Sequence, residues 1–128
     1  MTNYQDLQVW RKALDWAETV YAATSRWPKD ERFGLISQVR RAAVSVASNI
    51  AEGAARRSTG EFIHFVGMAQ GSLAEAETQL ILARRFDYLT DADAKSLQAA
   101  SAEISRMLAA LSSALKRRRD AAQSRPGH

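Results

Sequence analysis

The chain has 128 residues, 46% of them hydrophobic, and a formal net charge of +4, which fits one globular domain with a modest core. It contains no cysteine, which excludes disulfides, thiolate nucleophiles and cysteine metal sites. No apolar run approaches the roughly 20 residues that span a bilayer, and the first residues lack the basic and apolar regions of a signal peptide. We therefore expect a cytoplasmic protein without a membrane partner.

The spacing of apolar residues predicts a first helix over residues 6–27 with two apolar stripes. One stripe comprises Leu7, Trp10, Leu14, Ala17 and Tyr21, and the other comprises Val9, Ala13, Trp16, Val20, Ala23 and Trp27. Together they span roughly 200°, wider than the ~100° of a helix that faces one core. We assign Trp16, Val20 and Trp27 to an interface with a partner subunit. The alternative is that Trp16 and Trp27 pack beneath the following loop.

A second helix is predicted over residues 35–54, after a polar connector that Pro28 begins and Phe33 anchors. Its core stripe comprises Ile36, Val39, Ala43, Val46, Ala47, Ile50 and Ala54. We expect Asn49 and Glu52 to tie the end of this helix to a neighbour. Gly53 is expected to close it in the left-handed conformation that glycine adopts easily.

Ser58 and Glu61 have the spacing of a capping box, which opens a third helix over residues 59–88. Its core stripe is heptad-like and comprises Phe62, Phe65, Val66, Ala69, Leu73, Ala76, Leu80 and Ala83. Gly67 and Gly71 belong to a separate strip of small residues. Each of these glycines costs about 1 kcal/mol relative to alanine. The close approach of another helix, from the bundle or from a second subunit, would offset that cost.

A fourth helix is predicted over residues 91–118, because Thr90 and Asp93 resemble a capping box. Its core stripe comprises Leu97, Ala100, Ser101, Ile104, Leu108, Leu111 and Leu115. Short links make consecutive helices fold back on each other, which predicts an all-α, antiparallel up-down-up-down four-helix bundle. The expected domain organisation is a bundle over residues 1–119 and a disordered basic tail over residues 120–128.

Arginine outnumbers lysine, and much of it lies in runs. The candidate nucleic-acid-binding residues in these runs are Arg40, Arg41, Arg56, Arg57, Arg84, Arg85, Lys116, Arg117, Arg118 and Arg119. Arginine grips phosphate with a planar fork. In an antiparallel bundle, Arg56, Arg57 and residues 116–119 share one end, so we expect a basic pole that contacts phosphates without reading bases. A GC-rich genome, or simple solvation of helix ends, would also explain these runs.

The residues from Glu61 to His64 match the Glu-x-x-His spacing of di-iron helical bundles. Such a centre needs a second motif of this kind and two further carboxylates. The other histidine is His128, near the end of the chain, so we expect no metal site. Phosphate loops, dinucleotide fingerprints and nucleophile elbows are also absent from the sequence. We therefore predict a protein that is not an enzyme and needs no cofactor.

Several short motifs near the second corner resemble a known family. They are Asn49-Ile50-Ala51-Glu52-Gly53, Arg57-Ser58, Glu61-Phe62 and Ala69-Gln70-Gly71-Ser72-Leu73-Ala74-Glu75. Over roughly residues 4 to 90 the chain is similar to the four-helix bundle proteins encoded in intervening sequences of bacterial 23S ribosomal RNA genes. That family in turn resembles the accessory variability protein of diversity-generating retroelements. Ala54 departs from the family, in which a bulky residue is common at this position.

The resemblance implies a four-helix bundle and a ring-like homo-oligomer, which is a pentamer in the retroelement branch. For that branch it also implies nucleic-acid association and a reverse transcriptase as a partner. Combined with the arginine runs, this predicts a homo-oligomer that binds RNA or DNA without sequence specificity. The alternative is a protein-interaction scaffold or accessory subunit with no direct role on nucleic acid.

Overall fold

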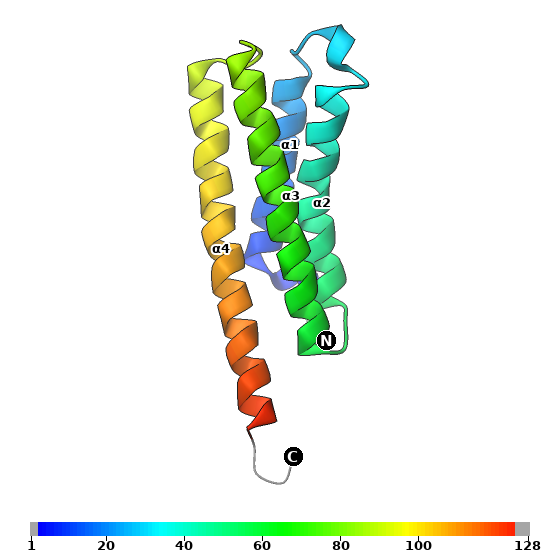
Figure 1. The fold of residues 1–128 in the computed structure, drawn as a ribbon, viewed down its shortest axis with the longest axis vertical. Coiled ribbons are helices and arrows are strands. Elements are labelled where there is room, and N and C mark those ends of the chain that lie inside the picture. The colour runs from blue at the N-terminus through cyan, green and yellow to red at the C-terminus, as the bar shows by residue number, and fades with distance from the viewer. Residues whose placement is uncertain (1–2, 125–128) are drawn as a thin grey trace.

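Four long helices make up the computed structural model, which describes residues 3–124. In chain order the elements are the 3-10 helix η1 (Tyr4–Asp6), α1 (Gln8–Thr24), the 3-10 helix η2 (Lys29–Glu31), α2 (Leu35–Ala54), α3 (Thr59–Arg85) and α4 (Asp91–Gln123). Consecutive helices run in opposite directions (Figure 1). The predicted all-α, antiparallel bundle is therefore confirmed.

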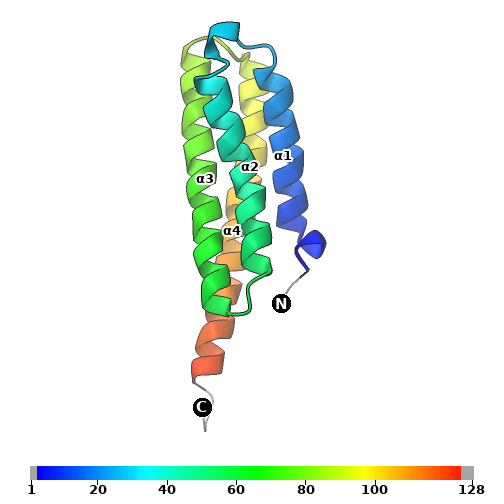
Figure 2. The same ribbon diagram turned by 90° about the vertical axis from the view of Figure 1, so that its right-hand side faces the viewer.

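We name the two ends of the bundle as they are drawn. The upper end holds η2 and the α3–α4 corner (residues 86–90), and the lower end holds the α2–α3 corner (residues 55–58) (Figures 1 and 2). Among residues 3–124, no helix combines the length and the apolar character that crossing a membrane requires.

Both predicted helix caps are present. The Ser58 Oγ accepts a hydrogen bond from the Glu61 backbone N–H at 3.0 Å, and the Thr90 Oγ1 accepts one from the Asp93 N–H at 3.1 Å. The helix α3 ends three residues earlier than predicted because Asp87 adopts a left-handed φ of 63°. The Tyr88 N–H then donates to the Ala83 carbonyl at 2.9 Å, as in a Schellman motif.

The assignment of Trp16, Val20 and Trp27 to a subunit interface is wrong. Within a single chain these side chains are only 2%, 0% and 4% exposed, and they belong to the bundle core. The Trp16 Nε1 donates to the Leu97 carbonyl of α4 at 3.1 Å. The helix α1 packs against both α2 and α4 with this stripe, which leaves Leu14 and Tyr21 of the other stripe exposed.

Gly53 does not take the predicted left-handed conformation but lies within α2, whose cap residue is Ala55. It is needed for close packing instead. A Cβ at this position would lie 2.8 Å from the Phe65 Cβ and 2.9 Å from the Phe62 Cδ1, both closer than real Cβ contacts allow. The first turns of α3 therefore rest directly on the last turn of α2, and this contact sets the position of the α2–α3 corner.

Gly67 and Gly71 are not approached from within the bundle. Both are exposed, and no other helix among residues 3–124 comes within 4 Å of a Cβ built at either position. The close approach of a bundle helix, one of the two explanations for these glycines, is thereby excluded.

The helix α4 is longer than predicted. It runs to Gln123, so the expected boundary at residue 119 and the disorder of residues 120–123 are wrong. Asp120, Ala121, Ala122 and Gln123 contain no helix breaker, and the helix simply continues. Residues 125–128 of the predicted tail lie outside the described range. Leu115 is the last buried residue of α4, and we call residues 116–123, which project past the α2–α3 corner, the overhang (Figure 2).

Candidate nucleic-acid interface

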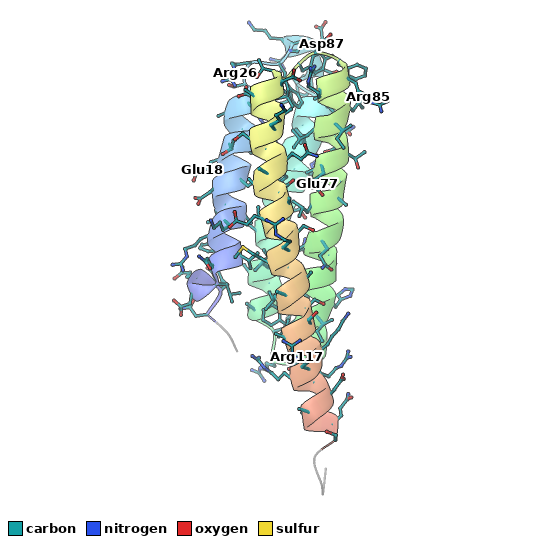
Figure 3. All side chains as sticks on the ribbon, turned by 90° about the vertical axis from the view of Figure 1, so that its left-hand side faces the viewer. Glu18, Arg26, Glu77, Arg85, Asp87 and Arg117 are labelled. Carbon is teal, nitrogen blue, oxygen red and sulfur yellow. The ribbon has the colours of Figure 1, made fainter. Side chains whose placement is uncertain are left out.

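The lower end of the bundle brings together the overhang and the α2–α3 corner. Figure 3 shows Arg117 at this end and Arg85 with Asp87 at the other. Arg57, Lys116, Arg117 and Arg118 are exposed, and among residues 3–124 none of these four has a carboxylate oxygen within 4.0 Å. Their charges are therefore not neutralised by acidic side chains of the described chain.

The overhang presents positive charge in nearly every direction. Successive residues of an α-helix are turned by about 100°, so four consecutive bases from Lys116 to Arg119 surround the helix axis. Arg119 is half-buried and lies 3.3 Å from Asp120, so part of its charge is balanced locally. The last turn of α4 itself carries no basic residue, so the helix dipole does not account for these charges.

Arg56 is held more firmly than Arg57. Its guanidinium Cζ lies 4.8 Å from the centre of the Phe65 ring, and its Nη2 is 4.0 Å from Glu52. The close packing at Gly53 places Phe65 beneath this arginine. His64 is exposed and meets Phe65 edge to face, with ring centres 5.6 Å apart. The corner therefore carries one arginine that packs on Phe65 and one that has no carboxylate partner among residues 3–124.

Two of the candidate arginines in the upper half have partners within the chain. The Arg84 Nε lies 2.8 Å from an Asp91 oxygen, and its Nη1 lies 3.2 Å from Asp87. The hydrogen bond to Asp91, together with the charge of that carboxylate, raises the pKa of Arg84 above its ordinary value. The Arg40 Nε donates to the Thr24 Oγ1 at 2.8 Å and ties α2 to α1. These two guanidinium groups stabilise the bundle, and we leave them out of the lower-end surface.

Arg41 and Arg85 are exposed, and among residues 3–124 neither has a carboxylate oxygen within 4.0 Å. Arg85 lies at the upper end, away from the overhang (Figure 3), and Arg41 lies in the first half of α2, which begins at the upper end. The candidate bases therefore fall into a lower-end group and an upper group.

Asn49 is linked to a neighbouring helix only through Ser45 of its own helix, and Glu52 is not linked to one. The Asn49 Nδ2 donates to the Ser45 carbonyl at 2.9 Å and to the Ser45 Oγ at 3.0 Å, and that hydroxyl accepts a hydrogen bond from Ser72 of α3 at 3.0 Å. Glu52 is exposed, and its partner is Arg56 of the same segment. Asn49 therefore has a structural role, while Glu52 contacts no neighbouring helix among residues 3–124.

Phe33 is a candidate functional residue that sequence reasoning missed. It was expected to anchor the connector, yet its side chain is 86% exposed, with the Arg32 guanidinium 4.8 Å from the ring centre. An aromatic residue in a polar connector normally packs inward. Nothing in the sequence indicates that Phe33 points outward instead. Among residues 3–124 there is no group of three or more side chains that could hold a metal ion.

Comparison with known proteins places this architecture in a family. No curated protein matches the chain. A crystal structure of a protein of unknown function from the S23 ribosomal protein family of Bacteroides thetaiotaomicron VPI-5482 is similar, with a TM-score of 0.73 and 26% sequence identity. The match covers 80% of this chain and 96% of that one. Residues 5–110 match the family described as 23S rRNA-intervening sequence protein, a range that ends before the overhang. The chain therefore belongs to the 23S rRNA-intervening sequence protein family.

Proposed function

We propose that the protein is a non-enzymatic homo-oligomer that binds RNA or DNA through its lower end, without sequence specificity. The observation that carries this proposal is the overhang, where Lys116, Arg117 and Arg118 project beyond the bundle without a carboxylate partner among residues 3–124. Arg56 and Arg57 add positive charge beside it at the α2–α3 corner. The proposed ligand is the phosphate backbone.

Phosphate contacts explain why no base reading is proposed. Each arginine or lysine that neutralises a phosphate releases condensed counterions, and this gain is independent of sequence. A single overhang offers few such contacts, so its affinity would be low at physiological salt. Repetition of the lower end in an oligomer multiplies the contacts, and simultaneous engagement of several subunits raises the overall affinity.

The outward face of α3 supports the proposal of an oligomer. Ile81 and Leu82 are 57% and 41% exposed, and at 100° per residue they flank the strip that contains Gly67 and Gly71. The opposite face of α3 is buried in the core. A helix with apolar side chains on two opposite faces usually packs against a second partner on its outer face. A second subunit packed on this strip would approach closely at the glycines, and the retroelement resemblance suggests five subunits.

Fluorescence anisotropy with labelled RNA and DNA duplexes across a salt series tests the binding proposal. We expect the logarithm of the binding constant to fall steeply and linearly with the logarithm of salt concentration. The triple variant Lys116→Ala, Arg117→Ala, Arg118→Ala should flatten this slope, since alanine keeps the helix but removes the contacts. The matched control is Lys95→Ala, an exposed base near the other end of α4. Absence of binding by the wild type even at low salt would refute the proposal.

Sedimentation equilibrium tests the oligomer. The wild type should form an assembly at micromolar concentration, and Ile81→Glu should reduce it to smaller species, because a buried unpaired carboxylate is strongly unfavourable in an interface. Ala109→Glu is the matched control, since Ala109 lies on an exposed face of α4. A monomeric wild type at this concentration would contradict the proposal.

A protein-interaction scaffold is the second candidate function. It is favoured by the exposed apolar side chains of α1 and α3, among them Leu14, Tyr21 and Met68. A different polypeptide, such as a reverse transcriptase of the kind that the resemblance implies, could cover these faces. An oligomer that binds neither duplex at low salt would favour this function over the first.

A further inference from the structure

A shallow depression of about 510 Å³ lies on the upper half of the molecule, where α2 begins beside α1. It is lined by Tyr21, Arg32, Phe33, Ile36, Ser37, Arg40, Arg41 and Val44. Two aromatic rings and three guanidinium groups thus share one surface, and none of the described residues that line it is acidic. The volume falls within the roughly 300–1,000 Å³ typical of sites for small ligands.

The aromatic rings of this depression are accessible. Phe33 is 86% exposed and Tyr21 is 44% exposed. The Arg32 guanidinium lies 4.8 Å from the Phe33 ring centre, and the Arg40 guanidinium lies 4.5 Å from that of Tyr21. Each ring therefore already pairs with a planar cation, and much of its surface is still open to solvent. Flat π surfaces next to planar cations are the features on which nucleic-acid bases stack.

Arg40 of the depression and Glu31 of the neighbouring connector both have hydrogen-bond partners within the bundle. Arg40 is fixed by hydrogen bonds to the Thr24 hydroxyl at 2.8 Å and the Tyr21 carbonyl at 3.3 Å. The carboxylate of Glu31 caps α2 through the Leu35 N–H at 3.3 Å and accepts a hydrogen bond from the Tyr88 hydroxyl at 2.9 Å, at the α3–α4 corner. The carboxylate of Glu31 is thereby engaged at the start of α2 and at the α3–α4 corner.

We propose that this depression binds an unpaired nucleotide of a single-stranded nucleic acid. The base stacks on Phe33 and Tyr21, while the phosphate pairs with the exposed Arg41 and with Arg32. That the ligand is a nucleic acid rests on the proposed function, but the depression is a different site from the lower end. The charge argues against a two-fold contact with a second copy of this chain, because such a contact would place the same three arginines against each other.

The two basic regions then differ in the form of nucleic acid they favour. Residues 116–123 of the overhang contain no aromatic side chain, and Phe65 at the adjacent corner is half-buried beneath Arg56. The lower end can therefore pair with the backbone of any polyanion. Stacking in the depression requires a base that is free of its partner strand, and this makes the depression selective for single strands.

The test compares Phe33→Ala with Phe86→Ala in the full chain. Both side chains are exposed, so neither variant should unfold, but among residues 3–124 only Phe33 of the two has an arginine over its ring. The probes are a short labelled oligouridine and a labelled RNA duplex, at low salt. Phe33→Ala should weaken oligouridine binding by about fivefold or more, the low end of stacking effects. The duplex affinity of Phe33→Ala should be unchanged, and so should the oligouridine and duplex affinities of Phe86→Ala.

Two results would overturn this inference, namely an unchanged oligouridine affinity in Phe33→Ala and an equal loss in Phe86→Ala. If the unchanged affinity came with a change of subunit number, the depression would be identified as an interface between copies. If the wild type binds the duplex but Phe33→Ala has no effect on oligouridine binding, only this site is excluded. If the wild type binds neither probe, the proposed function is excluded as well.

Discussion

The helix α3 ends in two arginines, and α4 carries a basic run about one turn before its end; the two runs have different roles in the structure. At the end of α3, Arg84 lies within hydrogen-bonding distance of Asp87 and Asp91, which belong to the corner and to the start of α4. Near the end of α4, Arg117 and Arg118 project into solvent, and among residues 3–124 no carboxylate pairs with them. The same residue type closes a corner in one place and is unpaired in the other.

The difference arises from what lies next to each run. The helix α3 is followed by a tight turn, and the first turn of the next helix carries acids that complement both the helix dipole and Arg84. The basic run of α4 lies past the last buried residue, Leu115, beyond the α2–α3 corner. A basic run is therefore a candidate ligand-binding surface only when the fold keeps it away from carboxylates.

Charge reversal at the two helix ends should give opposite results. Arg117→Glu should weaken duplex binding by about tenfold at low salt, because it both removes a phosphate contact and adds repulsion, and should leave thermal unfolding unchanged. Arg84→Glu should lower the melting temperature, since it places a third carboxylate beside Asp87 and Asp91. Anisotropy and calorimetry measure the two effects. If Arg84→Glu lost duplex binding and Arg117→Glu kept it, the roles assigned to the two basic runs would be contradicted.

A substitution at the α2–α3 corner tests whether the corner and the overhang form one surface. Gly53→Ala forces a Cβ against Phe62 and Phe65, and such overpacking should lower the free energy of unfolding by about 1–3 kcal/mol. The displaced corner should also weaken duplex binding, because Arg56 rests on Phe65.

Gly60→Ala is the control for this substitution, since a Cβ there meets nothing within 4 Å among the described residues. Urea denaturation gives the stabilities and anisotropy gives the affinities. A destabilised Gly53→Ala protein with full affinity would show that the overhang acts without the corner.

The smallest expected effect concerns pH at the upper end. The hydrogen bond to Glu31, then partial burial and the charges of Glu31 and Asp30, raise the pKa of Tyr88 above its ordinary value. The protonated form is therefore favoured in the folded state, so this stabilisation is present below about pH 10 and is lost as the pH rises through the raised value. Tyr88→Phe should be less stable than the wild type in urea at neutral pH, and the gap should shrink in alkali. A constant gap would contradict this account.

Periodicity and capping were sufficient to predict the fold. The core stripe and the bounds of α2 follow from apolar spacing, and the start of α3 follows from Ser58, because these signals are local. Phe65 is the exception in the predicted core stripe of α3, because it is only half-buried. The choice between the two stripes of α1 could not be made in the same way. Both are apolar, and the stripe with Trp16 is buried because α2 and α4 together face that side.

The candidate sites were less predictable because they depend on contacts between distant segments. Nothing local distinguishes Arg84 from Arg117 until the position of Asp91 is known. Gly53 at the end of a helical pattern is typical of a left-handed cap, and only the position of Phe65 reveals a packing role. The exposure of Phe33 likewise follows from the path of the connector, which its sequence does not specify.

Arginine-selective modification with phenylglyoxal, mapped by mass spectrometry with and without an RNA duplex, tests the central claim most directly. Without RNA, Arg57, Arg117 and Arg118 should react readily and Arg84 slowly, since Arg84 is engaged by two carboxylates. The duplex should protect the first three arginines and leave Arg85 reactive. Protection of Arg85 with undiminished reactivity of Arg117 and Arg118 would contradict the claim that the lower end is the nucleic-acid interface.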